Sequence, residues 1–282
     1  GAMSDDRANR PAFMQQDVGV GTENMRQQDL DTPRLKLIQG TSKELQEYND
    51  LRAGCFFHTA SETIFNTRED GLVKVVPLFM DVRYLLWRPL DDGGGILARS
   101  DDGIHWVPSD KEFIVKLDKQ DGGDTVKWKT APLVSESGLA DWGTMNPNDP
   151  ESPPAATLMF NYLLAFPEHP ELMPAVFTFQ RAALKAGKRF NTKLKTTRAP
   201  IFGLVFDMEA QVATNAANKD YYVPNLTGAG RIDDPDAYAI YKNLHNSFKS
   251  TGIKMQNVDD LADAPGNNDA GGDEPSGNGP NY

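Results

Sequence analysis

The sequence has few of the residues that disulfides and metal sites need. Its 282 residues include one cysteine, Cys55, and four scattered histidines. A single cysteine excludes an internal disulfide, and the histidine spacing matches no known pattern of metal ligands. We therefore expect no metal and no cofactor, and we interpret Cys55 as a buried thiol near a strand.

Long apolar runs are also missing. No stretch of about 18 apolar residues is present, and no charged, then apolar, then small-residue leader follows the start. Gly1, Ala2 and Met3 look like the remnant of a cleaved expression tag, so we expect the natural chain to start at Met3. The sequence thus predicts an intracellular protein without membrane contact.

Catalytic motifs are absent as well. The chain contains no nucleophile elbow and no His-Glu-x-x-His pair. The dense acidic pairs at residues 91–92 and 101–102 lie among glycines, which favours turns over a two-metal site. The triple glycine at residues 93–95 lacks the Gly-Lys-Ser/Thr of a phosphate loop. We expect a protein without catalytic residues, and a nuclease with unrecognised acids is the weaker alternative.

The charge is abundant but unevenly spread. The net charge is −11, from 40 acidic and 29 basic residues. Residues 1–32 hold six acids and three bases, and residues 259–282 hold six acids and no base. Removing both ends leaves 28 acids and 26 bases, a net charge of −2 for the body. The C-terminal segment ends in an aromatic residue, and its notable residues are Asp259, Asp260, Asp263, Asp269, Asp273, Glu274 and Tyr282.

One basic segment, residues 180–200, contrasts with this acidity. No acidic residue occurs between Glu171 and Asp207. The segment has a local charge of +7, carried by Arg181, Lys185, Lys188, Arg189, Lys193, Lys195 and Arg198. The spacing favours a helix, which Gly187 weakens by about 1 kcal/mol relative to alanine. Such a run neutralises the phosphates of an anionic polymer, or it is a solvated helix face that balances acidic neighbours.

Aromatic and basic residues also alternate, in the pairs Arg83-Tyr84, Trp87-Arg88 and Arg189-Phe190 and in the triplet Lys127-Trp128-Lys129. Single-stranded nucleic acid is bound by this combination, because flat rings stack on bases while cations follow the phosphates. In a strand the two lysines share the face opposite the tryptophan. Either the tryptophan is core and the lysines are a basic surface, or the reverse.

Hydrophobic patterning predicts a mainly β, α+β protein of short strands and two modest helices. We expect strands at residues 34–38, 55–59, 72–87, 104–107, 112–117, 125–130, 155–166, 173–179 and 201–213, an extended segment at 220–224, and a short polar helix at 42–48. The two modest helices are the one in the basic segment and one at residues 235–248, capped by Asp233 or Asp234. Pro77 predicts a bend or bulge in its strand. We also expect an irregular loop at residues 131–154 and a core that includes Phe177, Phe179, Phe202 and Phe206.

Three stretches carry a resemblance to a known family. They are residues 32–39 (Thr-Pro-Arg-Leu-Lys-Leu-Ile-Gln), residues 73–87 followed by Arg88-Pro89, and residues 177–185 leading through Thr192-Lys193 to Pro200. Together with the acidic tail they resemble the single-stranded DNA-binding proteins of tailed bacteriophages, which are built on an OB-type barrel. The resemblance implies one OB-like domain with extra strands at residues 32–256. The polar composition of the ends predicts a flexible arm at residues 1–31 and a disordered acidic tail at 257–282.

The function that this resemblance implies is non-enzymatic, sequence-independent binding of single-stranded DNA in phage DNA replication or recombination, in the host cytoplasm. The tail would inhibit binding or dock phage or host replication proteins. It departs from the usual pattern, in which acids run up to a terminal phenylalanine, because seven residues separate Glu274 from Tyr282. The alternative is a phage virion or assembly protein whose basic loop contacts a protein partner.

Overall fold

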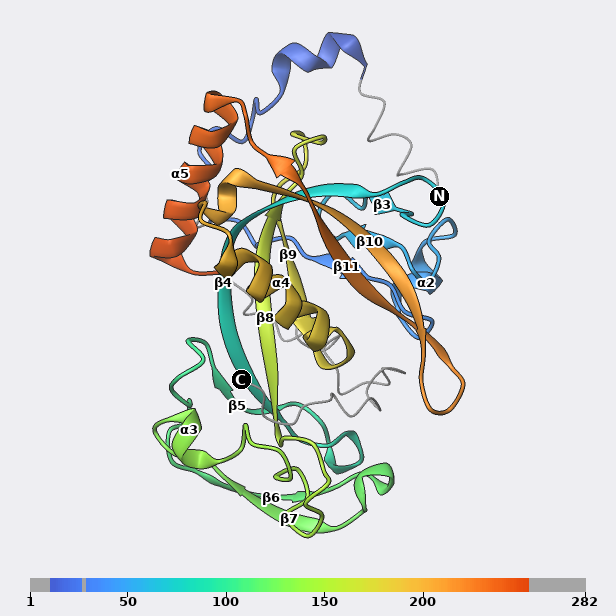
Figure 1. Ribbon diagram of the computed structural model, residues 1–282, viewed down its shortest axis with the longest axis vertical. Helices are drawn as coiled ribbons and strands as arrows, with labels where there is room; N and C mark the ends of the chain where they lie inside the picture. Colours follow the sequence, from blue (N-terminus) through green and yellow to red (C-terminus); the bar gives the residue numbers. More distant parts are fainter. Residues whose placement is uncertain (1–10, 27–28, 254–282) are drawn as a thin grey trace.

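The computed structural model describes residues 11–26 and 29–253, and it is mainly β, as predicted (Figure 1). The acidic tail expected at residues 257–282 lies outside this part of the chain. The strands are β1 (Leu35–Leu37), β2 (Phe56–His58), β3 (Ile64–Phe65), β4 (Val73–Trp87), β5 (Ile96–Ser100), β6 (Glu112–Lys116), β7 (Thr125–Lys129), β8 (Ala156–Ala165), β9 (Ala175–Gln180), β10 (Leu204–Thr214) and β11 (Asp220–Arg231). The α-helices are α2 (Glu44–Glu47), α3 (Val134–Ser137), α4 (Leu184–Thr196) and α5 (Pro235–Thr251), and the 3-10 turns are η1 (Ala12–Asp17), η3 (Leu90–Asp92), η4 (Lys119–Asp121), η5 (Arg181–Ala183) and η6 (Ile201–Gly203).

The long strand β4 organises the largest sheet. Along one side it pairs with β8, and along the other it pairs with β10 near its start and with β5 near its end. The register with β8 shifts between Pro77 and Phe79, which confirms the predicted bulge. Proline has no backbone N–H for the ladder, so an irregularity here costs the sheet little.

This sheet is open. Its strand order is β11-β10-β4-β8-β9, with β5 attached to β4, while β1-β2-β3 and β6-β7 form separate small sheets. The three-stranded sheet meets β9 where the Val176 N–H donates to the Pro33 carbonyl at 2.8 Å. The strands thus confirm the mainly-β class, but the order has two ends and does not confirm the closed OB-like barrel.

Four apolar clusters lie within the described part of the chain. The largest lies between the main sheet and α4 and includes the predicted core residues Phe177, Phe179 and Phe206. A second lies under the β6-β7 hairpin, and a third lies between β4, β8 and α5 and includes Phe202, the fourth predicted core residue. Cys55 is buried beside β2 in a small fourth cluster, as expected.

Helix α5 begins as predicted and lies along β4. The Asp234 carboxylate accepts a hydrogen bond from the Asp236 N–H at 3.0 Å and caps the helix. His245 Nδ1 lies 2.7 Å from the Leu78 carbonyl oxygen of β4. None of the 17 residues of α5 is fully buried. Neither this helix nor any other helix in the described ranges is long and apolar enough to cross a bilayer.

One predicted strand is wrong, and two short strands of the structure, β3 and β5, were not predicted. Residues 104–107 form isolated bridges instead of a strand, because the Asp102 carboxylate takes the N–H groups of Ile104 and His105, both at 2.8 Å. Strand β5 was not predicted, because its Ile-Leu-Ala-Arg-Ser sequence alternates too weakly to stand out.

Candidate nucleic-acid interface

Helix α4 presents the basic segment on the main sheet (Figure 1). Its buried residues are Gly187, Phe190 and Leu194, whose spacing of three and four places them on one side of the helix. A Cβ at position 187 would lie 2.6 Å from Phe179 Cβ. Glycine therefore permits the close approach of α4 to β9, which explains a residue that otherwise weakens the helix.

Two polar contacts further fix α4. The Tyr162 hydroxyl of β8 donates to the Asn191 side-chain oxygen. Burial raises the pKa of the Tyr162 phenol, so this donor keeps its proton at neutral pH. Lys193 Nζ donates to the Leu226 carbonyl of β11 at 2.7 Å. The helix is thus anchored to the sheet from both its apolar side and its flank.

The side of α4 that faces away from the sheet is cationic. The side chains of Lys185, Lys188, Arg189 and Lys195 are exposed, and Arg198 follows just after the helix. Within residues 11–26 and 29–253, none of these five cations has a carboxylate partner. At 1.5 Å per residue, the cations from 185 to 195 span about 15 Å. We call Lys185, Lys188, Arg189, Lys195 and Arg198 the α4 cations.

Two other cations of the basic segment have structural positions. Lys193 is committed to the β11 carbonyl described above. Arg181 is half-buried at the junction of β9 and α4, with a φ of 47°, a left-handed conformation that is uncommon for a residue with a side chain. These two cations keep their charge but are less free than the others to move toward a ligand.

Arg83, predicted to bind nucleic acid, is buried at 6% exposure, which corrects that prediction. Its guanidinium pairs with Asp81 at 3.1 Å and lies 3.6 Å from Asp101, and it donates to the Ile253 carbonyl. Buried charges need such partners. Arg83 thus holds Ile253, just beyond α5, against β4 and offers no charge to a ligand.

Arg88 also has a structural role. It pairs with Asp92 at 2.8 Å and donates to the Ile114 carbonyl at 3.3 Å, while the Asp92 carboxylate accepts from the Lys116 N–H at 3.1 Å. The Lys116 N–H and then the Arg88 side chain lower the pKa of Asp92. The ion pair therefore occupies backbone groups along the free edge of β6.

The predicted aromatic residues are largely enclosed. Trp128 and Phe190 are each 2% exposed, so neither ring can stack on a base, which corrects both predictions. Trp128 Nε1 donates to the Met145 carbonyl at 3.0 Å. Tyr84 is half-buried against Trp106, with ring centroids 6.4 Å apart, and burial raises its pKa. Trp87 is half-buried in the cluster beneath α5.

The positions of Lys127 and Lys129 show which face of the hairpin is basic and which face belongs to the core. Lys127 and Lys129 lie on the outer face of the β6-β7 hairpin and Trp128 lies in the core beneath it. Lys127 is 3.5 Å from Glu112 and Lys129 is 3.7 Å from Asp110. Their charges are therefore partly neutralised, unlike those of the α4 cations.

Residues 3–254 match the family described as Pam3 phage gp34-like protein. The chain belongs to this family. The match supports the phage part of the resemblance seen in the sequence, and the description names no activity. No curated protein and no solved structure matches the chain.

Of the predicted interface, the structure brings together only the α4 cations. Arg83, Arg88, Trp128 and Phe190 are structural, and Lys127 and Lys129 belong to the separate hairpin. Sequence reasoning missed Asn191, which fixes the helix, because an asparagine within a basic run gives no signal of its own. Among the described residues, no group of three His, Cys, Asp or Glu side chains is placed to hold a metal ion.

Proposed function

We propose that this protein binds single-stranded DNA without sequence preference, through the α4 cations, during phage DNA replication or recombination in the host cytoplasm. The observation that carries the proposal is the row of exposed cations on a firmly packed helix, none of which has a carboxylate partner within residues 11–26 and 29–253. Cations that neutralise phosphates release condensed counterions, which supplies most of the free energy of non-specific binding.

The packing of α4 favours this function. Gly187, Phe190 and Leu194 fix the helix on the sheet before any ligand arrives. A helix held in place loses little conformational freedom on binding, so more of the electrostatic gain appears as affinity. Lysine and arginine side chains are long and have many rotamers. They can therefore follow the irregular phosphate spacing of a single strand.

Base stacking has a smaller part in this proposal than the sequence indicated. With Trp128 and Phe190 in the core, Tyr84 and Trp87 are the aromatic candidates still partly accessible. Phosphate contacts carry no sequence information, so an interface dominated by them binds all sequences similarly. The proposal needs the basic surface and involves no catalytic step, and it does not depend on an OB-type barrel.

The acidic tail adds a second element to the proposal. Its origin is set by the described residues, because Arg83 holds the Ile253 carbonyl and Ile253 is buried. Six acids in residues 259–282, tethered to that point, compete with DNA for the α4 cations at high effective concentration. The same tail is also suited to dock phage or host replication proteins.

Titration of one labelled oligonucleotide of about 30 nucleotides, single-stranded and as a duplex, at two salt concentrations tests the proposal. We expect preference for the single strand and affinity that falls steeply with salt. Deletion of residues 259–282 should raise affinity at low salt and change little at high salt, because salt screens the competition. No binding at low salt, with or without the tail, would overturn the proposal and favour the assembly role, in which α4 contacts an acidic protein.

A further inference from the structure

The N-terminal segment exposes apolar side chains to an unusual degree. Between residues 11 and 26, each of five apolar side chains is more than half exposed: Phe13, Met14, Val18, Val20 and Met25. The backbone bonds of this segment are local turns, such as Val20 N–H to Asp17 O at 3.1 Å and Thr22 N–H to Gly19 O at 3.2 Å. We call residues 11–26 the apolar arm. Exposed apolar groups clustered in this way mark interaction surfaces.

Two hydrogen bonds connect the end of the apolar arm to the body of the protein. The Asp29 N–H donates to the Arg26 carbonyl at 2.9 Å, and the Arg26 N–H donates to the Asp29 carboxylate at 2.9 Å. These two bonds link the last residue of the arm, Arg26, to Asp29 at the start of the next described range. In Figure 1 the arm stands clear of the sheets, above α5.

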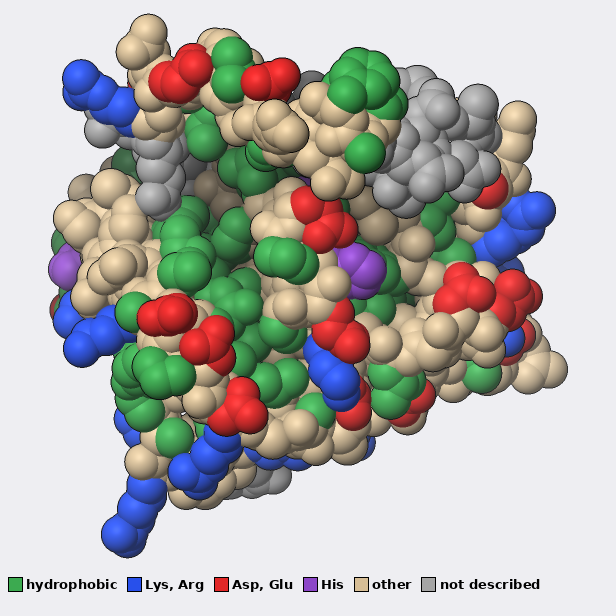
Figure 2. All heavy atoms as spheres, turned by 90° about the horizontal axis from the view of Figure 1, so that it is seen from above, with side chains coloured by type: hydrophobic (Ala, Val, Ile, Leu, Met, Phe, Trp, Pro, Cys, Tyr) green, Lys and Arg blue, Asp and Glu red, His purple; other side chains and the backbone are tan. Residues whose placement is uncertain are grey.

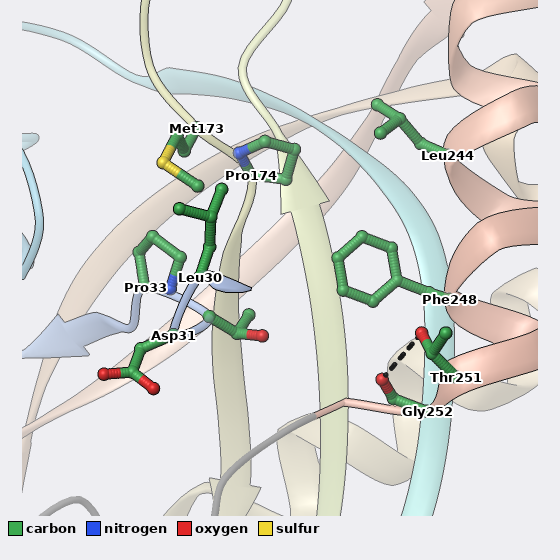
Figure 3. A pocket seen from close by; sticks show the side chains of 10 residues that line it. Leu30, Asp31, Pro33, Met173, Pro174, Leu244, Phe248, Thr251 and Gly252 are labelled. Atoms are coloured by element: carbon green, nitrogen blue, oxygen red, sulfur yellow. Dashed lines mark hydrogen bonds between the residues drawn. The ribbon is translucent and has the colours of Figure 1, made fainter. Parts of the chain in front are cut away.

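An apolar pocket lies at the root of the arm. Its volume is about 270 Å³, and its apolar lining comes from Leu30, Pro33, Met173, Pro174, Leu244 and Phe248. These side chains converge from the N-terminal segment, the β8-β9 turn and α5 (Figure 3). A cavity of about 150 Å³ holds one benzene-sized group, so this pocket has room for nearly two.

The same end of the molecule leaves α5 incompletely covered. Ile240, Leu244 and Phe248 lie four residues apart on one side of α5, and Ile240 is 58% exposed. Viewed from above, hydrophobic side chains gather in a hollow to the left of centre (Figure 2). The arm and an apolar surface of matching chemistry therefore lie at one end of a single chain, and neither covers the other.

We propose that the apolar arm of one copy docks in the pocket of a second copy, with Phe13 and Met14 entering between α5 and the β8-β9 turn. Because each chain carries both the arm and the pocket, the exchange is reciprocal and closes with two-fold symmetry, the commonest arrangement of homo-oligomers. Each exchange buries two large apolar side chains and the open side of α5. The proposal is independent of DNA binding, since it needs no nucleic acid.

The first test is the molar mass of the full chain in solution, measured by light scattering over a range of concentrations. We expect a mass that rises toward twice the 31.1 kDa of one chain. The variant Phe13→Ser/Met14→Ser should stay at one chain. The matched control is Ile114→Ser, which removes a 60% exposed apolar side chain from the distant β6-β7 hairpin and should behave as the parent. A parent of one-chain mass at all concentrations, or an arm variant indistinguishable from the parent, would overturn the proposal.

Cross-linking between two different variants tests the partner directly. Cys55 is 1% exposed and burial raises the pKa of its thiol, so it stays unreactive. Met14→Cys protein mixed with Leu244→Cys protein should give a two-chain product with a short bis-maleimide, without nucleic acid. The variant with both Met14→Cys and Leu244→Cys in one chain tests the opposite arrangement, in which the arm occupies the pocket of its own chain. If it forms mainly a loop within one chain, at a yield independent of concentration, the arm folds onto its own pocket and the exchange is wrong.

Discussion

Replacement of the α4 cations that lie on the helix itself is the sharpest test of the interface. The variant is Lys185→Ala/Lys188→Ala/Arg189→Ala/Lys195→Ala. Lys193 is kept, because its bond to the Leu226 carbonyl belongs to the packing of α4. Alanine is the best helix former, and the four side chains are exposed, so the fold should be retained.

The magnitude follows from counterion release. Each phosphate neutralised on a single strand contributes about 0.7 to the slope of log affinity against log salt. If all four cations bind phosphates, the slope of the variant is shallower by about 2.8. Between 50 mM and 200 mM salt, the parent should then lose about fiftyfold more affinity than the variant.

Fluorescence anisotropy with a labelled oligonucleotide at four or more salt concentrations measures this slope. The control is Lys127→Ala/Lys129→Ala, which removes exposed lysines that already lie near Glu112 and Asp110. We expect a smaller change in slope per charge for the control, and unchanged thermal unfolding for both variants. An α4 variant with the parent's slope, or with the same loss per charge as the control, would refute the assignment of the interface to α4.

Two further predictions concern the packing that supports the site. Gly187→Ala gains about 1 kcal/mol of helix propensity but forces a Cβ against Phe179, an overpacking that costs roughly 1–3 kcal/mol. The melting temperature of this variant should therefore fall. An unchanged or higher melting temperature would show that α4 can shift without cost. Asp92→Asn should destabilise the protein at neutral pH by weakening the bonds to Lys116 and Arg88. Because the folded-state pKa of Asp92 is lowered, its contribution is present above the unfolded value of about 4 and is lost as pH falls through the folded value. Denaturant unfolding of parent and variant at pH 7 and in acid should show a gap that narrows in acid, and an equal gap at both would contradict the role of this carboxylate.

The strands were predicted well where the chain itself carries the signal. Strands β4 and β8 follow runs of β-branched, aromatic and other apolar residues that are bounded by turns, and such runs need no knowledge of the partner strand. The start of α5, capped by Asp234, was also predicted from a signal in the local sequence. The order of the strands depends on long-range pairing, which is why the resemblance suggested a barrel and the structure has an open sheet.

The site was harder to predict, because neighbours in sequence do not share a face. Phe190 follows Arg189 in the basic segment, yet it lies on the buried side of α4 with Gly187 and Leu194. The spacing of these three residues was visible in the sequence and could have placed Phe190 in the core. The burial of Arg83 could not be seen there, since its partners Asp101 and Ile253 come from distant parts of the chain.

Free strand edges explain the positions of two predicted cations, Lys193 on β11 and Arg88 on β6. A free strand edge is a template for unwanted pairing, and proteins block it with charged side chains and prolines. On β11, Gln39 bonds both backbone groups of Tyr222, at 2.8 and 2.9 Å, Pro224 has no N–H, and Lys193 occupies the Leu226 carbonyl. On β6, Arg88 and Asp92 take the same role.

Cations that protect edges are held in place by their partners, so the partners of each cation, and not only the charge of the sequence, define the interface. Of the seven cations in the basic segment, Lys193 blocks an edge and Arg181 is half-buried, which leaves the five α4 cations. Five phosphate contacts correspond to a salt slope of about −3.5 on a single strand. A measured slope near that value would account for binding by α4 alone. A clearly steeper slope would require a second basic surface, and the hairpin lysines Lys127 and Lys129 would be the first to replace.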